Sequence, residues 1–146
     1  IEDNTTGGDY IAYIEIARAQ ERKTHIFLGG DSTCTAYYPI SSTDAETGSI
    51  RSGWGQVIGD FLTEDYEIVN LAEVMNTAEG WKNQALDSVL NQAESGDYFI
   101  GQFGLNEASQ KISNDVQAAA LTEITERCRE KGVNVILNTP QESGKS

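Results

Sequence analysis

Basic residues are scarce in this chain of 146 residues: ten lysines and arginines stand against 23 aspartates and glutamates, giving a formal net charge of −13. This balance argues against a nucleic-acid partner, because too few positive side chains are present to neutralise a row of phosphates. It argues equally against binding to an anionic membrane surface. No apolar run approaches the roughly 20 residues that span a bilayer.

Cysteine and histidine are also nearly absent. Cys34 and Cys128 are too few for a disulfide framework, and Cys128 falls on an apolar helical stripe that predicts a buried thiol. With His25 as the only histidine and no Cys-x-x-Cys pair, we expect no metal site and no cofactor. The glycine-rich motifs of nucleotide-binding loops are missing as well.

What the chain does contain is an alternation of short apolar runs and amphipathic stretches. The runs that predict strands are residues 25–29, 66–71, 98–103 and 133–138. Apolar residues spaced by three and four predict helices over about residues 53–63, 83–93 and 114–131. Strands that alternate with helices predict an α/β fold with a parallel sheet covered on both faces.

The sequence Gly-Asp-Ser-Thr at residues 30–33 is the most informative motif. It follows the first predicted strand, so Ser32 stands at the carboxyl end of a strand, where open α/β sheets bind their ligands. Gly30 allows the backbone to turn there without a clashing side chain. Gly, Asp and Ser are also ordinary turn residues, so the tetrapeptide alone leaves a plain loop as the alternative.

Four ordered stretches together resemble the SGNH (GDSL-type) hydrolases, most closely the rhamnogalacturonan acetylesterase-like branch. They are residues 27–33, 52–55, 70–72 and 96–107. The resemblance runs from about residue 24 to residue 140. It implies a flavodoxin-like three-layer sandwich with a parallel sheet in the strand order 2-1-3-4. The fifth strand of the family is missing from this chain. A stray β-strand is expected to precede the sandwich.

The resemblance also assigns roles to individual residues. Ser32 is expected to be the catalytic nucleophile, and its backbone N–H and the side-chain amide of Asn106 are expected to stabilise the oxyanion. Asn106 follows Gly104 at the end of the third predicted strand, on the same rim as Ser32. The alternative for Asn106 is a turn residue that bonds its own backbone. Gly30, Asp31 and Gly104 are expected to support the site.

The chain departs from the family pattern at three places. The family takes a third oxyanion donor from the backbone N–H of a glycine, but one alignment places Met75 at that position and another places Val74. A backbone N–H survives such a substitution, although the loop conformation need not. In the third block, Leu105 and Glu107 replace the usual histidine and aspartate. Because Glu107 is one methylene longer than the usual aspartate, its carboxylate lies in a different place, and the group that this carboxylate orients is expected to be altered.

A catalytic base for Ser32 is not evident. A serine esterase of this type needs a histidine held by a carboxylate. His25 lies at the opposite end of the first predicted strand, on the order of 20 Å from Ser32, and we expect it to be a surface or edge-strand residue. The resemblance places an Asp-x-x-His pair after the fifth strand, which we expect beyond residue 146.

The domain organisation expected from the resemblance has two parts. Residues 1–23 are expected to be the end of a preceding β-module plus a linker, and residues 24–146 an incomplete SGNH hydrolase domain. The alternative is a native extra strand on a small domain. The polar stretch 35–51 is expected to be a long loop in the cleft wall, with Tyr37 and Tyr38 beside Ser32.

The leading functional hypothesis is a secreted, extracellular serine esterase that removes O-acetyl groups from a plant polysaccharide, pectic rhamnogalacturonan first. The expected partner is an acetylated polysaccharide or oligosaccharide, and the open sheet edge beside the fourth strand favours self-association. One alternative is a non-catalytic carbohydrate-binding or scaffold domain with a degenerate SGNH fold. Another is an esterase or lipase for a different acyl ester, such as acetylxylan.

Overall fold

The structure, a computed structural model, describes residues 22–37 and 51–141. The elements in this part of the chain are four strands, four α-helices and one 3-10 helix, η1. In chain order they are β1 (Thr24–Gly30), α1 (Trp54–Val57), η1 (Ile58–Phe61), β2 (Tyr66–Asn70), α2 (Ala78–Gln92), β3 (Tyr98–Gln102), α3 (Leu105–Gln110), α4 (Asn114–Glu130) and β4 (Asn134–Asn138). The stray β-strand predicted within residues 1–23 and most of the predicted linker lie outside the described residues.

The four strands form one parallel sheet in the order β2-β1-β3-β4. The predicted strand order is therefore confirmed, and the chain has an α/β flavodoxin-like fold. Leu28 of β1 lies opposite Asn70 of β2 and Ile100 of β3, and Gly30 lies opposite Gln102. This register brings the carboxyl ends of β1, β2 and β3 to the same edge of the sheet.

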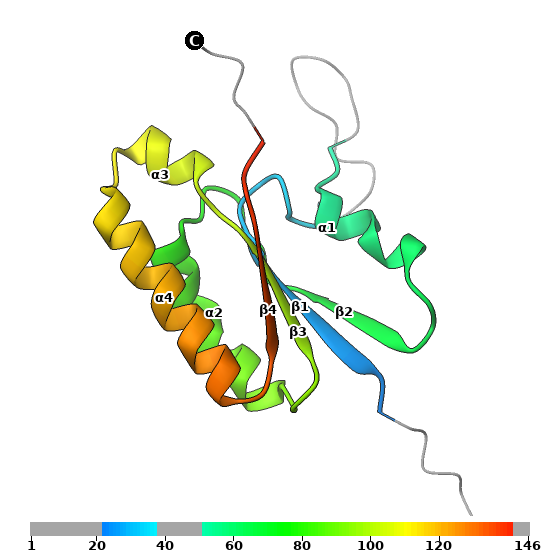
Figure 1. Cartoon of the computed structure of the whole chain (residues 1–146). Coiled ribbons are helices and arrows are strands. Elements are labelled where there is room, and N and C mark those ends of the chain that lie inside the picture. The colour runs from blue at the N-terminus through cyan, green and yellow to red at the C-terminus, as the bar shows by residue number, and fades with distance from the viewer. Residues whose placement is uncertain (1–21, 38–50, 142–146) are drawn as a thin grey trace, which may run out of the picture.

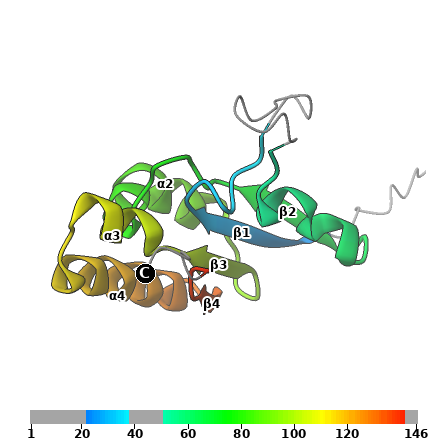
Figure 2. The same ribbon diagram turned by 90° about the horizontal axis from the view of Figure 1, so that it is seen from above.

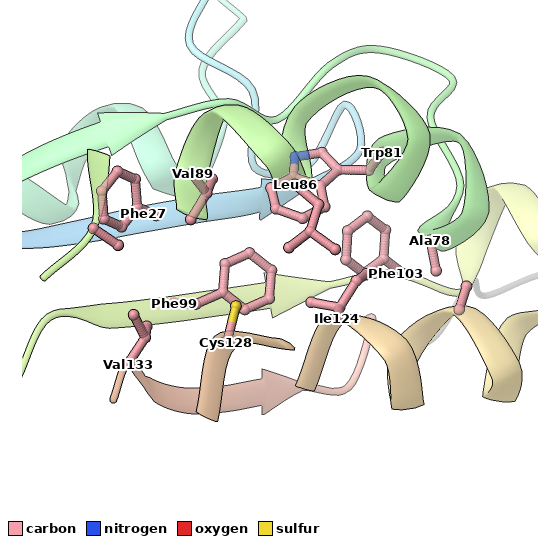
Figure 3. Close-up of a cluster of buried hydrophobic side chains, with 12 residues drawn as sticks. Phe27, Ala78, Trp81, Leu86, Val89, Phe99, Phe103, Ile124, Cys128 and Val133 are labelled. Carbon is pink, nitrogen blue, oxygen red and sulfur yellow. The ribbon is translucent and has the colours of Figure 1, made fainter. Parts of the chain in front are cut away.

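Helices cover the sheet on both faces, as Figure 1 and the view from above in Figure 2 show. On one face, α2 and α4 pack side by side over the larger apolar cluster, which includes Phe27, Trp81, Phe99 and Ile124. Figure 3 shows these side chains filling the space between the sheet and the two helices. The ring centroids of Trp81 and Phe99 are 4.9 Å apart. Cys128 is fully buried in this cluster, as predicted.

The opposite face is covered by α1 and η1, which lie against β1 and β2 (Figure 1). A smaller apolar cluster forms there around Ile26, Leu28 and Cys34, with Trp54 and Ile58 packed against it. The predicted helix over residues 53–63 is present but breaks into α1 and η1. The β-branched residues and the glycine at the junction have poor helix propensity, which accounts for the break.

Two further helices differ from the prediction. Helix α2 begins at Ala78 rather than near residue 83, because Thr77 caps it by accepting a hydrogen bond from the Gly80 N–H. The fully buried Trp81 lies in this additional turn. Helix α3 was not predicted, since six residues are too few to show a 3.6-residue period. In the described residues no helix has the length and apolar character needed to cross a membrane.

The amino ends of β1 and β3 are joined by Asp97, whose side chain is buried. Its carboxylate accepts two hydrogen bonds from the Arg22 guanidinium, at 2.9 and 2.6 Å, and one each from the backbone N–H groups of His25 and Glu94. Burial by itself raises the pKa of Asp97, but the bonds from Arg22 and the two N–H groups outweigh it and lower the pKa to about 2.

Candidate active site

The turn that follows β1 is held by Asp31. The side chain of Asp31 is fully buried, and its Oδ1 accepts hydrogen bonds from the Thr33 backbone N–H at 2.9 Å and from the Thr33 hydroxyl at 2.8 Å. Its backbone carbonyl accepts from the N–H groups of Cys34 and Thr35, both at 3.0 Å. Ser32 lies inside this turn and is half-buried. The conformation of the predicted nucleophile is thus fixed by the preceding residue.

The sequence Gly-Trp-Gly at residues 53–55 places α1 directly against this turn. The Trp54 N–H donates to the Thr33 carbonyl at 2.9 Å. A Cβ atom on Gly53 would collide with the backbone of Thr35, and one on Gly55 would collide with the Cys34 carbonyl. Both glycines are therefore required for the close approach. Cys34 is buried where α1 and the turn meet. Burial, together with the nearby Asp31 carboxylate, raises the pKa of the Cys34 thiol to about 12.

A groove of about 500 Å³ opens beside Ser32. Its lining residues are Ser32, Thr33, Tyr37, Arg51, Ser52, Gly53, Trp54, Val57 and Gln141. The Tyr37 hydroxyl donates to the Ser32 carbonyl at 2.9 Å, and the Tyr37 N–H donates to the Gln56 side chain at 3.0 Å. The predicted place of Tyr37 beside Ser32 is confirmed. Tyr38 and most of the predicted wall loop lie outside the described residues.

Asn106 occupies the first turn of α3, after Gly104, whose φ of 135° is one that favours glycine. The side-chain amide of Asn106 is buried and donates a hydrogen bond of 2.8 Å to the Asn76 carbonyl. Asn76 belongs to the loop between β2 and α2, so the side chain bridges two loops. The alternative of a turn residue that bonds its own backbone is wrong. The second amide hydrogen donates no bond among the residues described.

Backbone conformation distinguishes Met75 from Val74. Met75 has a φ of 65°, in the left-handed region that favours glycine, and Val74 does not have a positive φ. Met75 is therefore the better counterpart of the glycine expected from the resemblance. Its carbonyl accepts a bond of 3.1 Å from the Gln110 side chain. Within residues 22–37 and 51–141, the backbone N–H groups of Ser32 and Met75 donate no hydrogen bond.

The three loops at this edge of the sheet are bonded to one another. The Glu73 N–H, after β2, donates to the Gly30 carbonyl at 3.1 Å. The Gln102 side chain, at the end of β3, donates to the Thr33 hydroxyl at 2.7 Å. Asn70 donates to the Cys34 carbonyl at 2.9 Å. The sequence alone did not single out Gln102 or Glu73, because nothing in their local sequence signals a contact with residues so distant along the chain.

His25 lies at the amino end of β1, away from Ser32. Its imidazole is near two carboxylates, with Nε2 3.6 Å from Glu67 and Nδ1 3.9 Å from Asp97. His25 is expected at the surface or on an edge strand; β1 lies between β2 and β3 and is therefore not an edge strand, and the His25 side chain is 21% exposed. In the part of the chain that the structure describes, no group of three His, Cys, Asp or Glu side chains is placed to hold a metal ion.

Comparison with known proteins adds two informative relatives. The uncharacterized esterase YxiM of Bacillus subtilis is 32% identical over 120 residues, which are 80% of this chain and 30% of that protein. Its crystal structure superposes with a TM-score of 0.72 at 31% identity, over 82% of this chain and 33% of that one. The probable rhamnogalacturonan acetylesterase YesY of the same organism is 29% identical over 123 residues, 80% of this chain and 53% of that protein.

The fold is shared more widely. The acetylxylan esterase Axe2 of Geobacillus stearothermophilus superposes with a TM-score of 0.58 at 17% identity, over 80% of this chain and 60% of that one. The fold is consistent with an SGNH hydrolase, and both Bacillus subtilis relatives are named as esterases. No protein-family model matches the chain. This chain spans 30% of YxiM and 53% of YesY, about a third to a half of the length of these curated relatives.

Proposed function

We propose that this protein is an SGNH hydrolase that removes O-acetyl groups from a carbohydrate, with Ser32 as the nucleophile. The observation that carries the proposal is the convergence of three loops at the carboxyl edge of the sheet, where Ser32, Met75 and Asn106 each retain an N–H group without an acceptor among the described residues. Relatives named as esterases support the same reaction class.

In the proposed reaction, the Ser32 hydroxyl attacks the acetyl carbonyl carbon and its proton passes to a base. The C=O electron pair moves onto the oxygen, and the backbone N–H groups of Ser32 and Met75 and the Asn106 amide donate to that oxyanion. Collapse of the intermediate breaks the bond to the sugar oxygen, which takes the proton from the protonated base and leaves as a hydroxyl, so that an acetylated serine remains. Water then hydrolyses the acetyl-enzyme by the same two steps.

The base is proposed to be a histidine outside these 146 residues. His25, the one histidine in the chain, is bonded into the opposite end of the sheet through its backbone contact with Asp97. An Asp-x-x-His pair reaching the groove beside Ser32 would complete the arrangement, because the carboxylate holds the imidazole in the tautomer that accepts the serine proton.

For the substrate, we propose acetylated pectic rhamnogalacturonan, and an extracellular site of action. Arg51 is the basic side chain among the residues that line the groove beside Ser32, and uronate carboxylates pair well with a guanidinium. The activity in the name of YesY favours the same polymer. Acetylxylan, the substrate class in the name of Axe2, carries no such carboxylate on its backbone and is the second candidate.

The test is acetate release by the complete gene product from acetylated rhamnogalacturonan oligosaccharides and from acetylated xylan oligosaccharides of matched length. We expect faster release from the pectic substrate, and we expect an Arg51→Gln variant to reduce that preference. Equal rates on both substrates would overturn the pectic assignment. Binding of either oligosaccharide without acetate release would instead establish the non-catalytic alternative.

A further inference from the structure

Glu107 is a buried carboxylate for which the proposed reaction has no direct use. Its side chain is 3% exposed. Oε1 accepts a hydrogen bond of 2.6 Å from the Ala78 N–H, and Oε2 accepts one of 2.8 Å from the Gly104 N–H. Ala78 is the first residue of α2, and Gly104 immediately precedes α3. One carboxylate therefore joins the beginnings of two helices that follow different strands.

Each of these helix beginnings is adjacent to a proposed oxyanion donor. Ala78 follows the loop that contains Met75, and Gly104 lies two residues before Asn106. Carboxylates at helix N-termini are stabilised by the helix dipole and by N–H groups that have no partner within the helix. The two bonds of Glu107 thus fix the separation of the two donor-bearing segments.

Two other side chains of α3 hold the same loop. Asn106 donates to the Asn76 carbonyl, and Gln110 donates to the Met75 carbonyl at 3.1 Å. Three α3 side chains therefore bind backbone groups of residues 75, 76 and 78. With its carbonyl held by Gln110, Met75 is kept in the left-handed conformation that its side chain disfavours.

We propose that Glu107 is a positioning residue for the oxyanion site: its carboxylate holds the Met75 loop and Asn106 at the spacing that lets both donate to one oxygen. The inference rests on the proposed function. A donor displaced by a fraction of an ångström loses transition-state stabilisation while ground-state binding changes little, because the oxyanion forms only during the reaction.

The experiment is a double-mutant cycle in the complete gene product, with kcat and KM measured for Glu107→Gln, Asn106→Ala and the double variant. The amide that replaces the carboxylate would keep one acceptor oxygen but turn an NH₂ group toward one of the two N–H donors. We expect Glu107→Gln to lower kcat about 10- to 100-fold with KM within about twofold. In the Asn106→Ala background the same substitution is expected to cost much less, because one of the donors it positions is already gone.

Asp97 supplies the matched control. It is also a buried carboxylate that accepts two backbone N–H groups, those of His25 and Glu94, but it lies at the opposite end of the sheet. Asp97→Asn is expected to lower stability while the folded protein keeps its kcat. Equal loss of kcat in Asp97→Asn and Glu107→Gln, or the same fold-loss for Glu107→Gln with and without Asn106, would reduce Glu107 to a purely structural residue and overturn the proposal.

A second variant covers the case in which Glu107→Gln does not fold. Gln110 is exposed, and Gln110→Ala removes the bond to the Met75 carbonyl without creating a cavity. We expect kcat to fall severalfold with KM unchanged, and an unchanged kcat would contradict positioning by α3. If the wild-type protein releases no acetate, the proposed function fails. The hydrogen-exchange protection of the Ala78 and Gly104 amides, expected to fall in Glu107→Gln, would then still test whether the carboxylate holds both segments.

Discussion

The side-chain amide of Asn106 donates a hydrogen bond of 2.8 Å to the backbone carbonyl of Asn76, a residue 30 positions earlier in the chain. This bond uses one of the two amide hydrogens and fixes the direction of the other. Because the bond also holds the loop that contains Met75, Asn106 does two things: it offers a donor and it orients the segment that carries another.

Ser32→Ala in the complete gene product is expected to remove nearly all acetate release, because the nucleophile and its base act as one unit. Asn106→Ala is expected to lower kcat by about 10²–10³, as for other single oxyanion donors. The measurement is acetate release under saturating substrate. Ser95→Ala, on the exposed turn before Asp97, serves as the control and is expected to keep full activity. Retained activity in Ser32→Ala would remove Ser32 from the mechanism.

The 146-residue chain by itself is expected not to hydrolyse p-nitrophenyl acetate above the buffer rate at neutral pH. His25, the one histidine of the sequence, is held at the far end of β1, away from Ser32. Initial rates for the chain and for its Ser32→Ala variant should therefore coincide. Turnover that depends on Ser32 would show that a base is supplied by this chain or by a neighbouring copy.

Met75→Gly is expected to raise the free energy of unfolding by up to about 1 kcal/mol, because a residue with a side chain is strained in the left-handed region. The substitution keeps the backbone N–H, so kcat should be retained. Met75→Pro removes that N–H and is incompatible with a φ of 65°, so it should lower both stability and kcat. Urea denaturation and steady-state kinetics measure the two effects. A Met75→Gly protein that is less stable than the wild type would contradict the claim that the backbone of Met75 is strained.

The free energy of unfolding is expected to fall as the pH drops from about 4 to 2. The pKa of Asp97 is lowered to about 2 in the folded protein from an ordinary value of 3.8. The unfolded state therefore takes up the proton first, so this stabilisation is complete above pH 4 and is lost as pH falls through the folded pKa. The contribution is on the order of 2 kcal/mol. In urea titrations, Asp97→Asn should make the free energy of unfolding less dependent on pH between about 4 and 2. An unchanged pH dependence would show that other carboxylates cause it.

The 146-residue chain is expected to self-associate through β4. In the described part of the sheet β4 pairs only with β3, and its Ile136 and Leu137 side chains are 44% and 46% exposed. An edge strand with exposed apolar residues favours pairing with another chain. Sedimentation velocity over a range of concentrations should show a dimer or larger species that Ile136→Lys diminishes. A monomer at every concentration would refute the prediction.

Much of the fold follows from local sequence. The apolar run before Gly30 predicts a strand that ends at the nucleophile turn, and the spacing of apolar residues in α4 predicts both its length and the burial of Cys128. These features depend on neighbours within a few positions, which is the range over which hydrophobic periodicity operates. The strand order came from the resemblance of ordered motifs, since periodicity alone does not specify which strands pair.

The sequence by itself determined that Ser32 follows a buried strand and that Asn106 follows another, both at carboxyl ends. Only the tertiary structure decided how the two are held: that Met75 rather than Val74 takes the left-handed conformation, and that Glu107 joins Ala78 to Gly104. The physical reason is distance along the chain. Glu107 and Ala78 are 29 positions apart, and a hydrogen bond between them leaves no periodic trace in the sequence around either.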